Sequence, residues 1–373
     1  MKLSNVLYIT PNYPLPGFPE RGAFVDNLLR EFLEAGVYSS VICPTSIAEK
    51  MRYYFAKRYE LSLAADRIYR PYYLSYSNLK IGPLNTGNFS RASFSKACSR
   101  PHLHGTFDVA IGKFLLSGGL AAVRISKKLG IPAFADIGES RSLLSFNKEE
   151  KKAARETLDD LSGMYCVSSR LADELVILGA DPSKIMIVPN MADQSRFYPM
   201  DKYTCRSHLG LDPDDKIVIF VGHFIERKGS MRVLQALKKL PEEYKVIFLG
   251  RGAQKPSGER VVYAGSVPNS DLPKWLNAAD IFCLPTLSEG HCNAIEEAKA
   301  CGLPVVSSHI TSVIEQLQGY TAITVDPQSI ADIGNAIYEF GANPRPRSCA
   351  IMSSKMKRGE RIIQWIGSKI GSS

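Results

Sequence analysis

The sequence of 373 residues predicts two α/β domains, each built on a doubly wound parallel sheet. Short apolar runs such as Val6–Thr10 and Ile217–Val221 recur along the chain with helical segments between them, as in successive βαβ units. A hydrophobic content of 45% is enough for two buried cores in a chain of this length. A polar segment containing proline leaves the strand Ile185–Pro189, so the domain boundary is predicted near Asn190.

The first domain begins with a strand whose following loop is rich in proline. A nicotinamide-binding domain would carry G-x-G-x-x-G at this point, and this loop does not. The helices expected are Ala23–Ala35, Gly118–Leu129, Lys148–Leu161 and one that Ser168 caps and Gly179 ends. The strands expected are Val6–Thr10, Val37–Pro44, Asp108–Phe114, Ile131–Ile137, Met164–Val167 and Ile185–Pro189.

The second domain repeats the alternation of strands and helices. A final amphipathic helix, Met352–Ile366, follows an Arg-rich stretch. The strands expected are Ile217–Val221, Val246–Gly250, Val261–Ala264, a short run ending at Pro285 and another starting at Val305, and the helices include Asp271–Ala278 and Ala294–Cys301.

The stretch from Asp280 to Ser307 carries the functional hypothesis. Asn293 is the expected N-cap of the helix Ala294–Cys301, and Glu296 three residues later completes a pattern resembling a capping box. Glu289 before the helix and Glu297 in its first turn flank a helix N-terminus, which suits a phosphate. A carboxylate accepts two hydrogen bonds from a vicinal diol, so the pair fits a nucleotide-sugar. Both glutamates are equally consistent with acids that simply favour a helix start.

The string S-E-G-H-C-N-A-I-E-E-A-K-A-C-G-L-P-V-V resembles the E-x7-E signature of retaining glycosyltransferase family 4. Members of that family have the GT-B fold, in which two Rossmann-like domains face a cleft. The resemblance implies an acceptor-binding domain over residues 1–189, a donor domain over 190–345 and a C-terminal helix, 346–373, that returns to the first domain. It implies that Glu289 contacts hydroxyls of the donor sugar and that Glu297 contacts the ribose. The helix start that would hold the diphosphate comprises Gly290, His291, Cys292 and Asn293.

The resemblance extends to the loop after Ile217–Val221. The family usually has an arginine where His223 stands and a lysine where Lys228 stands, both directed at the donor diphosphate. The Lys228 charge would stabilise the leaving nucleoside diphosphate, and Arg227 would compensate for His223. A surface lysine is the plainer interpretation of Lys228, although the helix dipole disfavours one at a helix start. The backbone near Val267 is expected to border the nucleotide base, and Gly22 to approach the diphosphate.

The first domain departs from the family pattern after two of its strands. Family members often carry histidines there, whereas this sequence has Lys113 and the pair Gly138–Glu139. Glu139 is expected to orient an acceptor hydroxyl, as a general base would, and an exposed loop glutamate is the alternative.

The predicted function is therefore retaining transfer of a sugar from a nucleotide-diphosphate donor to a hydroxyl of a lipid-linked glycan acceptor in cell-envelope or exopolysaccharide synthesis. No metal and no cofactor are expected, and the nucleotide-sugar is a substrate. A non-catalytic sugar-binding relative that scaffolds envelope assembly is one alternative, supported by His223, Lys113 and Gly138. A nucleotide-sugar epimerase or a sugar phosphorylase on the same fold is another.

The charge distribution and the cysteine pattern indicate where in the cell the protein works. The formal net charge is +9, and residues 50–100 contain ten Lys or Arg against Glu60 and Asp66. This basic, tyrosine-rich segment fits an anionic membrane surface, a solvated face or, less well, a nucleic acid, and no nucleic-acid partner is predicted. The eight cysteines lack a C-x-x-C pair, and His102 and His104 stand without further metal ligands. With no signal peptide expected, the prediction is a cytoplasmic protein, peripheral to the inner face of the membrane.

Overall fold

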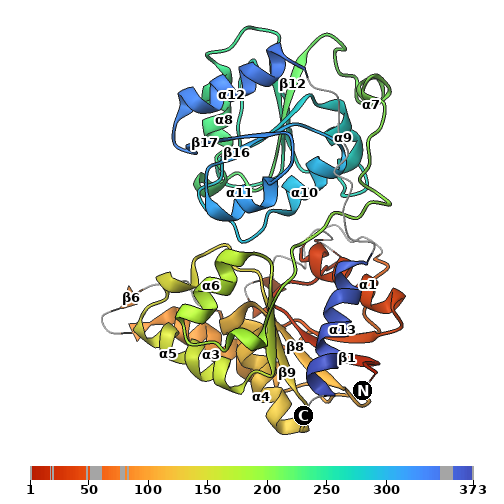
Figure 1. The fold of residues 1–373 in the computed structure, drawn as a ribbon, viewed down its shortest axis with the longest axis vertical. Helices are drawn as coiled ribbons and strands as arrows, with labels where there is room; N and C mark the ends of the chain where they lie inside the picture. Colours follow the sequence, from red (N-terminus) through yellow and green to blue (C-terminus); the bar gives the residue numbers. More distant parts are fainter. Residues whose placement is uncertain are drawn as a thin grey trace. The chain divides into compact units, whose positions relative to one another are not determined.

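The computed structural model describes the chain except residues 1, 17, 19–20, 48, 51–60, 76–79, 82–83, 345–355 and 372–373. The chain divides into two compact units (Figure 1). The first unit comprises Met1–Pro189 together with Ser354–Ser373, and the second comprises Asn190–Ser353. This division falls at the predicted boundary near Asn190, whereas the predicted boundary at 345–346 lies outside the described residues.

The first unit is built on a parallel sheet of seven strands in the order β11-β10-β9-β8-β1-β2-β4. All six of its strand pairings are parallel, as the alternating pattern predicts. The chain order reverses between β1 and β8, which are neighbours in the sheet. The strands are β1 (Asn5–Ile9), β2 (Tyr38–Ile42), β4 (Arg67–Tyr69), β8 (Val109–Lys113), β9 (Ala133–Ile137), β10 (Gly163–Cys166) and β11 (Ile185–Ile187), with the short strands β3 (Thr45–Ser46), β5 (Tyr72–Tyr73), β6 (Lys80–Ile81) and β7 (Leu84–Asn85) outside this sheet.

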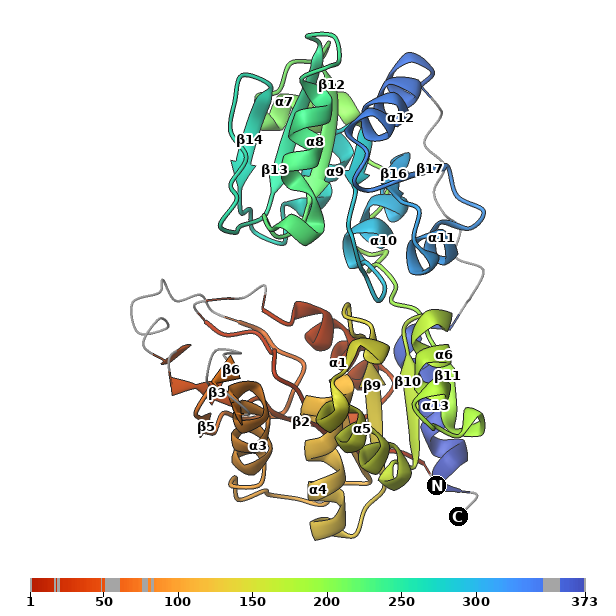
Figure 2. The same ribbon diagram turned by 90° about the vertical axis from the view of Figure 1, so that its left-hand side faces the viewer.

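Helices cover both faces of this sheet, which is why its central strands are buried along almost their whole length. Successive residues of β1 face opposite sides: Val6 and Tyr8 join one core cluster, whereas Leu7 and Ile9 join another. The first cluster lies beneath α1 and α13, and α3, α4 and α5 lie over the other face (Figure 2). The helices are α1 (Ala23–Glu34), α3 (Thr86–Cys98), α4 (Leu120–Leu129), α5 (Lys148–Asp160), α6 (Ser169–Ile177) and α13 (Arg358–Ile370).

The C-terminal helix belongs to the first unit, although its predicted bounds were wrong. The described helix α13 starts at Arg358 and extends to Ile370, beyond the predicted end at residue 366. The Trp365 ring packs edge-on against Phe134 of β9, with ring centroids 5.8 Å apart. The backbone N–H of Gly359 donates to the carboxylate of Glu31 on α1 at 2.6 Å. These contacts join the last helix to the sheet and to the first helix.

A further difference from the sequence prediction lies after β8. The helix expected from Gly118 is preceded by a π-helical turn over Phe114–Gly119. Phe114 opens this turn at φ 66°, a left-handed conformation that is uncommon for a residue with a side chain. A Cβ on Gly112 would lie 2.1 Å from the Gly118 backbone, and a Cβ on Gly118 would lie 2.5 Å from the Lys113 backbone and from the Ile9 carbonyl oxygen of β1. This contact depends on tertiary packing, which periodicity does not report.

The second unit is built on a parallel sheet of six strands in the order β14-β13-β12-β15-β16-β17. Helices α8 and α12 lie side by side over one face, and α7, α9 and α10 lie over the other (Figures 1 and 2). The strands are β12 (Lys216–Val221), β13 (Tyr244–Leu249), β14 (Val261–Gly265), β15 (Ile281–Leu284), β16 (Val305–Ser308) and β17 (Ala322–Val325), and the helices are α7 (Lys202–Leu209), α8 (Ser230–Leu237), α9 (Leu272–Ala278), α10 (Asn293–Ala300), α11 (Thr311–Leu317) and α12 (Ile330–Ala342).

Among the described residues, none of the helices has both the length and the apolar character needed to cross a bilayer. All seven cysteines in this part of the chain are buried and form no disulfide, whereas Cys349 lies outside it.

Candidate active site

The strand order of the second unit brings two distant loops together. Strands β12 and β15 are neighbours, and the chain runs outward from them in opposite directions, which is the switch point where open α/β sheets bind ligands. The Leu287 backbone N–H, after β15, donates to the Arg227 carbonyl oxygen, after β12, at 2.8 Å. The Thr286 hydroxyl oxygen lies 3.2 Å from the same carbonyl oxygen. Side chains that are 60 residues apart in the sequence therefore meet at one sheet edge.

Glu289 is the centre of this meeting point. One of its carboxylate oxygens, Oε1, accepts hydrogen bonds from Lys228 Nζ at 2.6 Å, Arg227 Nη1 at 3.0 Å and the Thr286 hydroxyl at 2.8 Å. Glu289 is only 6% exposed, and the Ser312 hydroxyl fixes its backbone carbonyl at 2.8 Å. The structure thus brings together Glu289, Lys228 and Arg227, three of the predicted site residues, and adds Thr286, which the sequence prediction did not include.

Lys228 stays cationic in this setting. Burial alone would lower the pKa of its ammonium, but Cys292 and Glu289 outweigh burial and raise that pKa above its ordinary value. Burial in turn raises the pKa of the Cys292 thiol to about 11, so the thiol is neutral near pH 7 and Glu289 is the charged partner of Lys228 at that pH. Lys228 and Arg227 together exceed the single negative charge of Glu289. The cluster therefore has a surplus of positive charge for an anionic ligand.

A glycine allows the Lys228 loop to lie against the end of β15. Lys228 ends one turn of 3-10 helix, Glu226–Lys228, and Gly229 follows at φ 84°. A Cβ at Gly229 would lie 2.6 Å from the Pro285 carbonyl oxygen. Gly229 therefore meets both a left-handed backbone and a close backbone approach, which fixes the position of Lys228 beside Glu289.

The start of α10 corrects the predicted cap. Cys292 is the N-cap residue, and Asn293 is the first residue of the helix. The Asn293 side chain instead accepts a hydrogen bond from the Asn190 amide at 2.9 Å. Gln316 accepts from the Cys292 N–H at 3.1 Å and donates to the Cys292 carbonyl at 2.7 Å. One of the four expected phosphate-binding amides, that of Cys292, is therefore already bonded within the protein.

The two adjacent glutamates of α10 have different surroundings. Glu296 accepts hydrogen bonds from Lys299 at 3.0 Å and from Gln316 at 2.9 Å, and it does not close the predicted capping box. Glu297 is the fifth residue of the helix rather than part of its first turn, and its carboxylate has no hydrogen-bond partner among the described residues. Burial raises the pKa of Glu297 to about 7, which Arg196 partly opposes. Glu297, rather than Glu296, is the carboxylate that remains available to hydroxyls.

The other expected donor-binding residues are less tightly placed. His223 is exposed, whereas the His291 side chain is largely buried, with its Nε2 atom 3.7 Å from Glu296 Oε1. Val267 packs at the margin of the second unit's core. Gly22, in the first unit, adopts φ 66°, and a Cβ there would lie 2.3 Å from the Asn12 carbonyl oxygen, so the turn requires glycine.

The first unit presents a different arrangement at its own switch point. Lys113 is buried and donates to Asp136 at 2.7 Å, and the Tyr8 hydroxyl donates to the other Asp136 oxygen at 2.5 Å. Lys113 is thereby committed to an internal ion pair. Glu139 accepts from the Leu115 N–H at 2.6 Å, while its other oxygen, Oε2, is buried and has no hydrogen-bond partner among the described residues. Burial raises the pKa of Glu139.

The basic segment predicted to meet a membrane is only partly described. Arg52, Lys57 and Arg58 lie outside the described residues.

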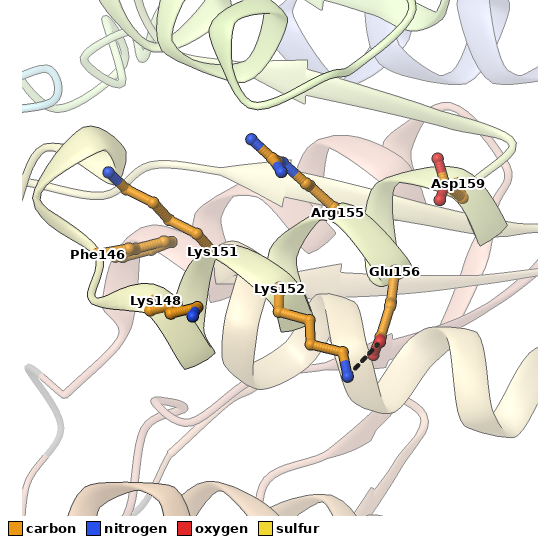
Figure 3. A pocket seen from close by; sticks show the side chains of 7 residues that line it. All are labelled: Phe146, Lys148, Lys151, Lys152, Arg155, Glu156 and Asp159. Carbon is orange, nitrogen blue, oxygen red and sulfur yellow. Dashed lines mark ion pairs between the residues drawn. The ribbon is translucent and has the colours of Figure 1, made fainter.

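A separate hollow of about 500 Å³ lies along α5, where Lys151 and Arg155 extend to one side and the pair Lys152–Glu156 to the other (Figure 3). Among the described residues, no group of three or more metal-ligating side chains occurs.

Comparison with known proteins identifies a family that most of the second unit matches. Residues 215–343 match the family model described as Glycosyl transferases group 1. We refer to this segment as the group 1 domain, after the family model that it matches. It contains the Lys228–Glu289 cluster and the whole of α10.

Relatives by sequence extend beyond the group 1 domain. The chain is 24% identical over 349 residues to TuaC of Bacillus subtilis, a protein named as a glycosyltransferase of teichuronic acid biosynthesis, and the match covers 90% of this chain and 88% of TuaC. It is 30% identical over 191 residues to the D-inositol 3-phosphate glycosyltransferase of Xylanimonas cellulosilytica, a match that covers 44% of this chain and 46% of that protein.

Solved structures show that the whole chain has the GT-B fold, as the sequence predicts. Sucrose-phosphate synthase of Thermosynechococcus elongatus superposes with a TM-score of 0.73 at 18% identity, over 99% of this chain and 97% of that one. HepE of Anabaena, crystallised with UDP and glucose, superposes with a TM-score of 0.71 at 16% identity, over 99% of this chain and 100% of HepE. At these identities the likeness concerns the fold alone.

Proposed function

We propose that the protein transfers a sugar, with retention of anomeric configuration, from a nucleotide-diphosphate donor to a hydroxyl of a glycan acceptor in cell-envelope polysaccharide synthesis. The observation that carries the proposal is the convergence of Lys228 and Arg227 on Glu289 at the switch point of the group 1 domain. HepE, with the same fold, is described in complex with UDP-glucose. TuaC is named for polysaccharide biosynthesis. Both support a nucleotide-sugar donor and a glycan product.

The chemistry assigned to each residue follows from its charge and surroundings. The bond between the anomeric carbon and the diphosphate oxygen breaks, and its electron pair leaves with the nucleoside diphosphate. Lys228 and Arg227 offset the growing charge on that leaving group, which is the largest electrostatic demand of the reaction. Glu289 positions both cations and accepts hydrogen bonds from sugar hydroxyls, while Glu297 accepts from the ribose.

The acceptor hydroxyl attacks on the face that the diphosphate leaves, and its proton passes to a departing phosphate oxygen. The first unit is proposed to hold this acceptor, with Glu139 orienting the attacking hydroxyl. The unpartnered Oε2 atom of Glu139 supports this role, because it can accept or donate one further hydrogen bond. A lipid-linked acceptor at a membrane surface remains part of the proposal. The supporting feature is the basic character of residues 50–100.

A thermal-shift screen of UDP-, GDP- and ADP-sugars identifies the donor, since a ligand that binds the folded state raises its melting temperature. Transfer from the best donor to membrane lipid extracts then tests the reaction. We expect Glu289→Ala to lower turnover by about 100-fold or more, whereas exposed Glu242→Ala retains wild-type turnover. Binding without turnover by the wild type, on any donor and extract, would favour a non-catalytic relative.

A nucleotide-sugar epimerase is the second candidate, since a UDP-N-acetylglucosamine 2-epimerase of Listeria monocytogenes is a structural neighbour with a TM-score of 0.59 at 12% identity. Incubation of the donor without acceptor separates the two, because an epimerase alone would convert it to a second nucleotide-sugar.

A further inference from the structure

Two arginines of the first unit gather at the carboxyl edge of its sheet, away from Lys113 and Glu139. Arg21 lies in the loop that follows β1, and Arg70 directly follows β4. Between them, β2 leads into Cys43 and Thr45. Strands β1, β2 and β4 are paired in parallel, so their carboxyl ends meet at one edge, where α/β sheets bind ligands.

Backbone hydrogen bonds fix these segments relative to one another. The Cys43 N–H donates to the Tyr69 carbonyl at 2.9 Å, and the Thr45 N–H donates to the Pro71 carbonyl at 2.9 Å. Thr45 is therefore bonded to the residue that follows Arg70. The loop after β1 is held from both sides, because Arg21 donates to the Pro11 carbonyl at 2.8 Å and Arg70 donates to the Pro14 carbonyl at 2.5 Å.

The Arg70 guanidinium has an unmet hydrogen bond. Its Nη1 is buried and has no partner among the described residues, and the same holds for the hydroxyl of Thr45, which is 4% exposed. A buried donor left unpaired costs about 1–3 kcal/mol, and more when it is charged. One such donor lies on Arg70 and another on Thr45, in two segments that are hydrogen-bonded to each other, and together they favour an acceptor atom that a ligand would supply.

The charge of this edge favours an anion. Glu49 is the acid nearest to Arg21, at 3.3 Å, and one of its oxygens also accepts from the Ser46 N–H at 3.1 Å. Burial lowers the pKa of Arg70, and the positive charge of Arg21 lowers it further. The two guanidinium groups therefore repel each other, and Glu49 is paired with Arg21. A bound oxyanion would relieve that repulsion.

We propose that Arg70, Thr45 and Arg21 form an oxyanion-binding subsite, and that the sugar acceptor of this protein carries a carboxylate or a phosphate. The planar guanidinium fork matches either group with two parallel hydrogen bonds, and the threonine hydroxyl supplies a third donor. This assignment rests on the proposed function in one respect, that the first unit holds the acceptor.

Calorimetric titration of the full chain tests the subsite without requiring turnover. Glucuronate and glucose 1-phosphate supply the two oxyanions, and glucose is the neutral sugar that matches them. Arg70→Gln removes the charge and the fork, and Thr45→Val removes one donor at nearly constant volume. Arg67→Gln is the matched control, because Arg67 lies three residues earlier on β4, where it donates to the exposed His104 carbonyl at 3.0 Å. UDP binding, measured on every variant, reports that the second unit is intact.

We expect an oxyanion-bearing sugar to bind the wild type at least tenfold more tightly than glucose, with an affinity that falls as salt rises. Arg70→Gln should abolish this preference, Thr45→Val should weaken it several-fold, and Arg67→Gln should leave it unchanged. The more tightly bound of the two sugars then identifies the anionic group.

Equal binding of all three sugars by the wild type would overturn the proposal. So would an oxyanion preference that survives both Arg70→Gln and Thr45→Val, since ordered water would then be the partner of these donors. The two proposals fail separately. Loss of UDP-sugar binding concerns the group 1 domain, whereas loss of the oxyanion preference concerns this subsite alone.

Discussion

Each unit of the protein has a lysine–carboxylate pair beside the switch point of its sheet, and the two pairs have opposite surroundings. The side chains of Lys113 and Asp136 in the first unit are 5% and 1% exposed, whereas those of Lys228 and Glu289 in the second are 14% and 8% exposed. The distances are nearly the same, 2.7 Å and 2.6 Å. Geometry within the pair therefore does not distinguish a structural pair from a functional one.

The neighbours of each pair make the distinction. The buried Tyr8 hydroxyl donates a hydrogen bond to the Asp136 carboxylate, and Arg358 Nη2 of α13 lies 3.9 Å from Asp136 Oδ1. Around Glu289, by contrast, the second cation is Arg227, whose side chain is 35% exposed. A buried and fully bonded pair stabilises the fold. A pair at the rim of a sheet, with an exposed cation beside it, can exchange its partners for those of a ligand.

The largest expected effect is on turnover. Lys228→Ala removes a cation that offsets charge on the leaving group, and we expect the rate of transfer to fall about 1,000-fold, equivalent to about 4 kcal/mol. Lys238→Ala, in the exposed residue that follows α8, is the control and should leave the rate unchanged. A rate for Lys228→Ala within threefold of wild type would place the catalytic charge elsewhere and would erase the contrast between the two pairs.

The complementary change affects stability. Lys113→Met leaves Asp136 buried without its main partner, and we expect the free energy of unfolding of the first unit to fall by about 3–5 kcal/mol. The chain has two tryptophans, Trp275 in the second unit and Trp365 in the first. Urea unfolding followed by fluorescence in a Trp275→Phe background therefore reports the first unit. An affinity for UDP that drops along with stability would show that this pair also serves the donor site.

The pH dependence of donor binding sharpens the assignment of Glu297. Because burial raises its pKa to about 7, the carboxylate that would accept ribose hydrogen bonds is mostly ionised at pH 8 and mostly protonated at pH 6. We expect the affinity for UDP to fall roughly tenfold as pH is lowered from 8 to 6, and Glu297→Gln to remove that dependence. Titration calorimetry at both pH values on both proteins corrects for the phosphates of UDP. Parallel profiles would exclude Glu297 from the site.

The raised pKa of Glu297 also predicts that the second unit becomes less stable as pH rises. A carboxyl whose pKa is higher in the folded than in the unfolded state destabilises the fold as pH rises from about 4.5 to 7. Glu297→Gln should therefore stabilise the second unit at pH 8 by on the order of 1–2 kcal/mol and have little effect at pH 4.5. The midpoint of urea unfolding, followed by Trp275 fluorescence in a Trp365→Phe background, measures this difference.

The smallest expected effect is that of metal removal. If Lys228 and Arg227 supply the charge that offsets the diphosphate, dialysis against EDTA should change the transfer rate less than twofold. Loss of activity that Mg²⁺ restores would show that the two side chains are insufficient.

Local patterns predicted the elements that depend on local physics. The apolar runs predicted the strands, and Gly302 ends α10 at φ 78°, as its position indicated. The spacing of Glu289 and Glu297 predicted two acids around a helix start. The confirmed GT-B fold followed from the alternation of elements and from the family resemblance.

The predictions that failed depended on residues far away in the sequence. Asn293 was the expected N-cap, but Gln316, 24 residues after Cys292, bonds both the N–H and the carbonyl of Cys292. Nothing in the sequence around Lys113 shows that it will pair with Asp136 in the core, and the π-helical turn that follows places Gly118 where a Cβ would lie 2.5 Å from the Ile9 carbonyl oxygen. Partners of this kind become visible only when the chain is folded.

The assignment of α13 to the first unit has a consequence for biosynthesis. Residues 358–370 emerge from the ribosome after the whole of the group 1 domain, yet Trp365 packs against Phe134, and Ile362 and Ile366 belong to a core cluster that also contains Leu3. The group 1 domain, which is continuous in sequence, has all of its strands available earlier. The first unit therefore finishes folding after the second, because part of its apolar surface stays uncovered until α13 has been synthesised.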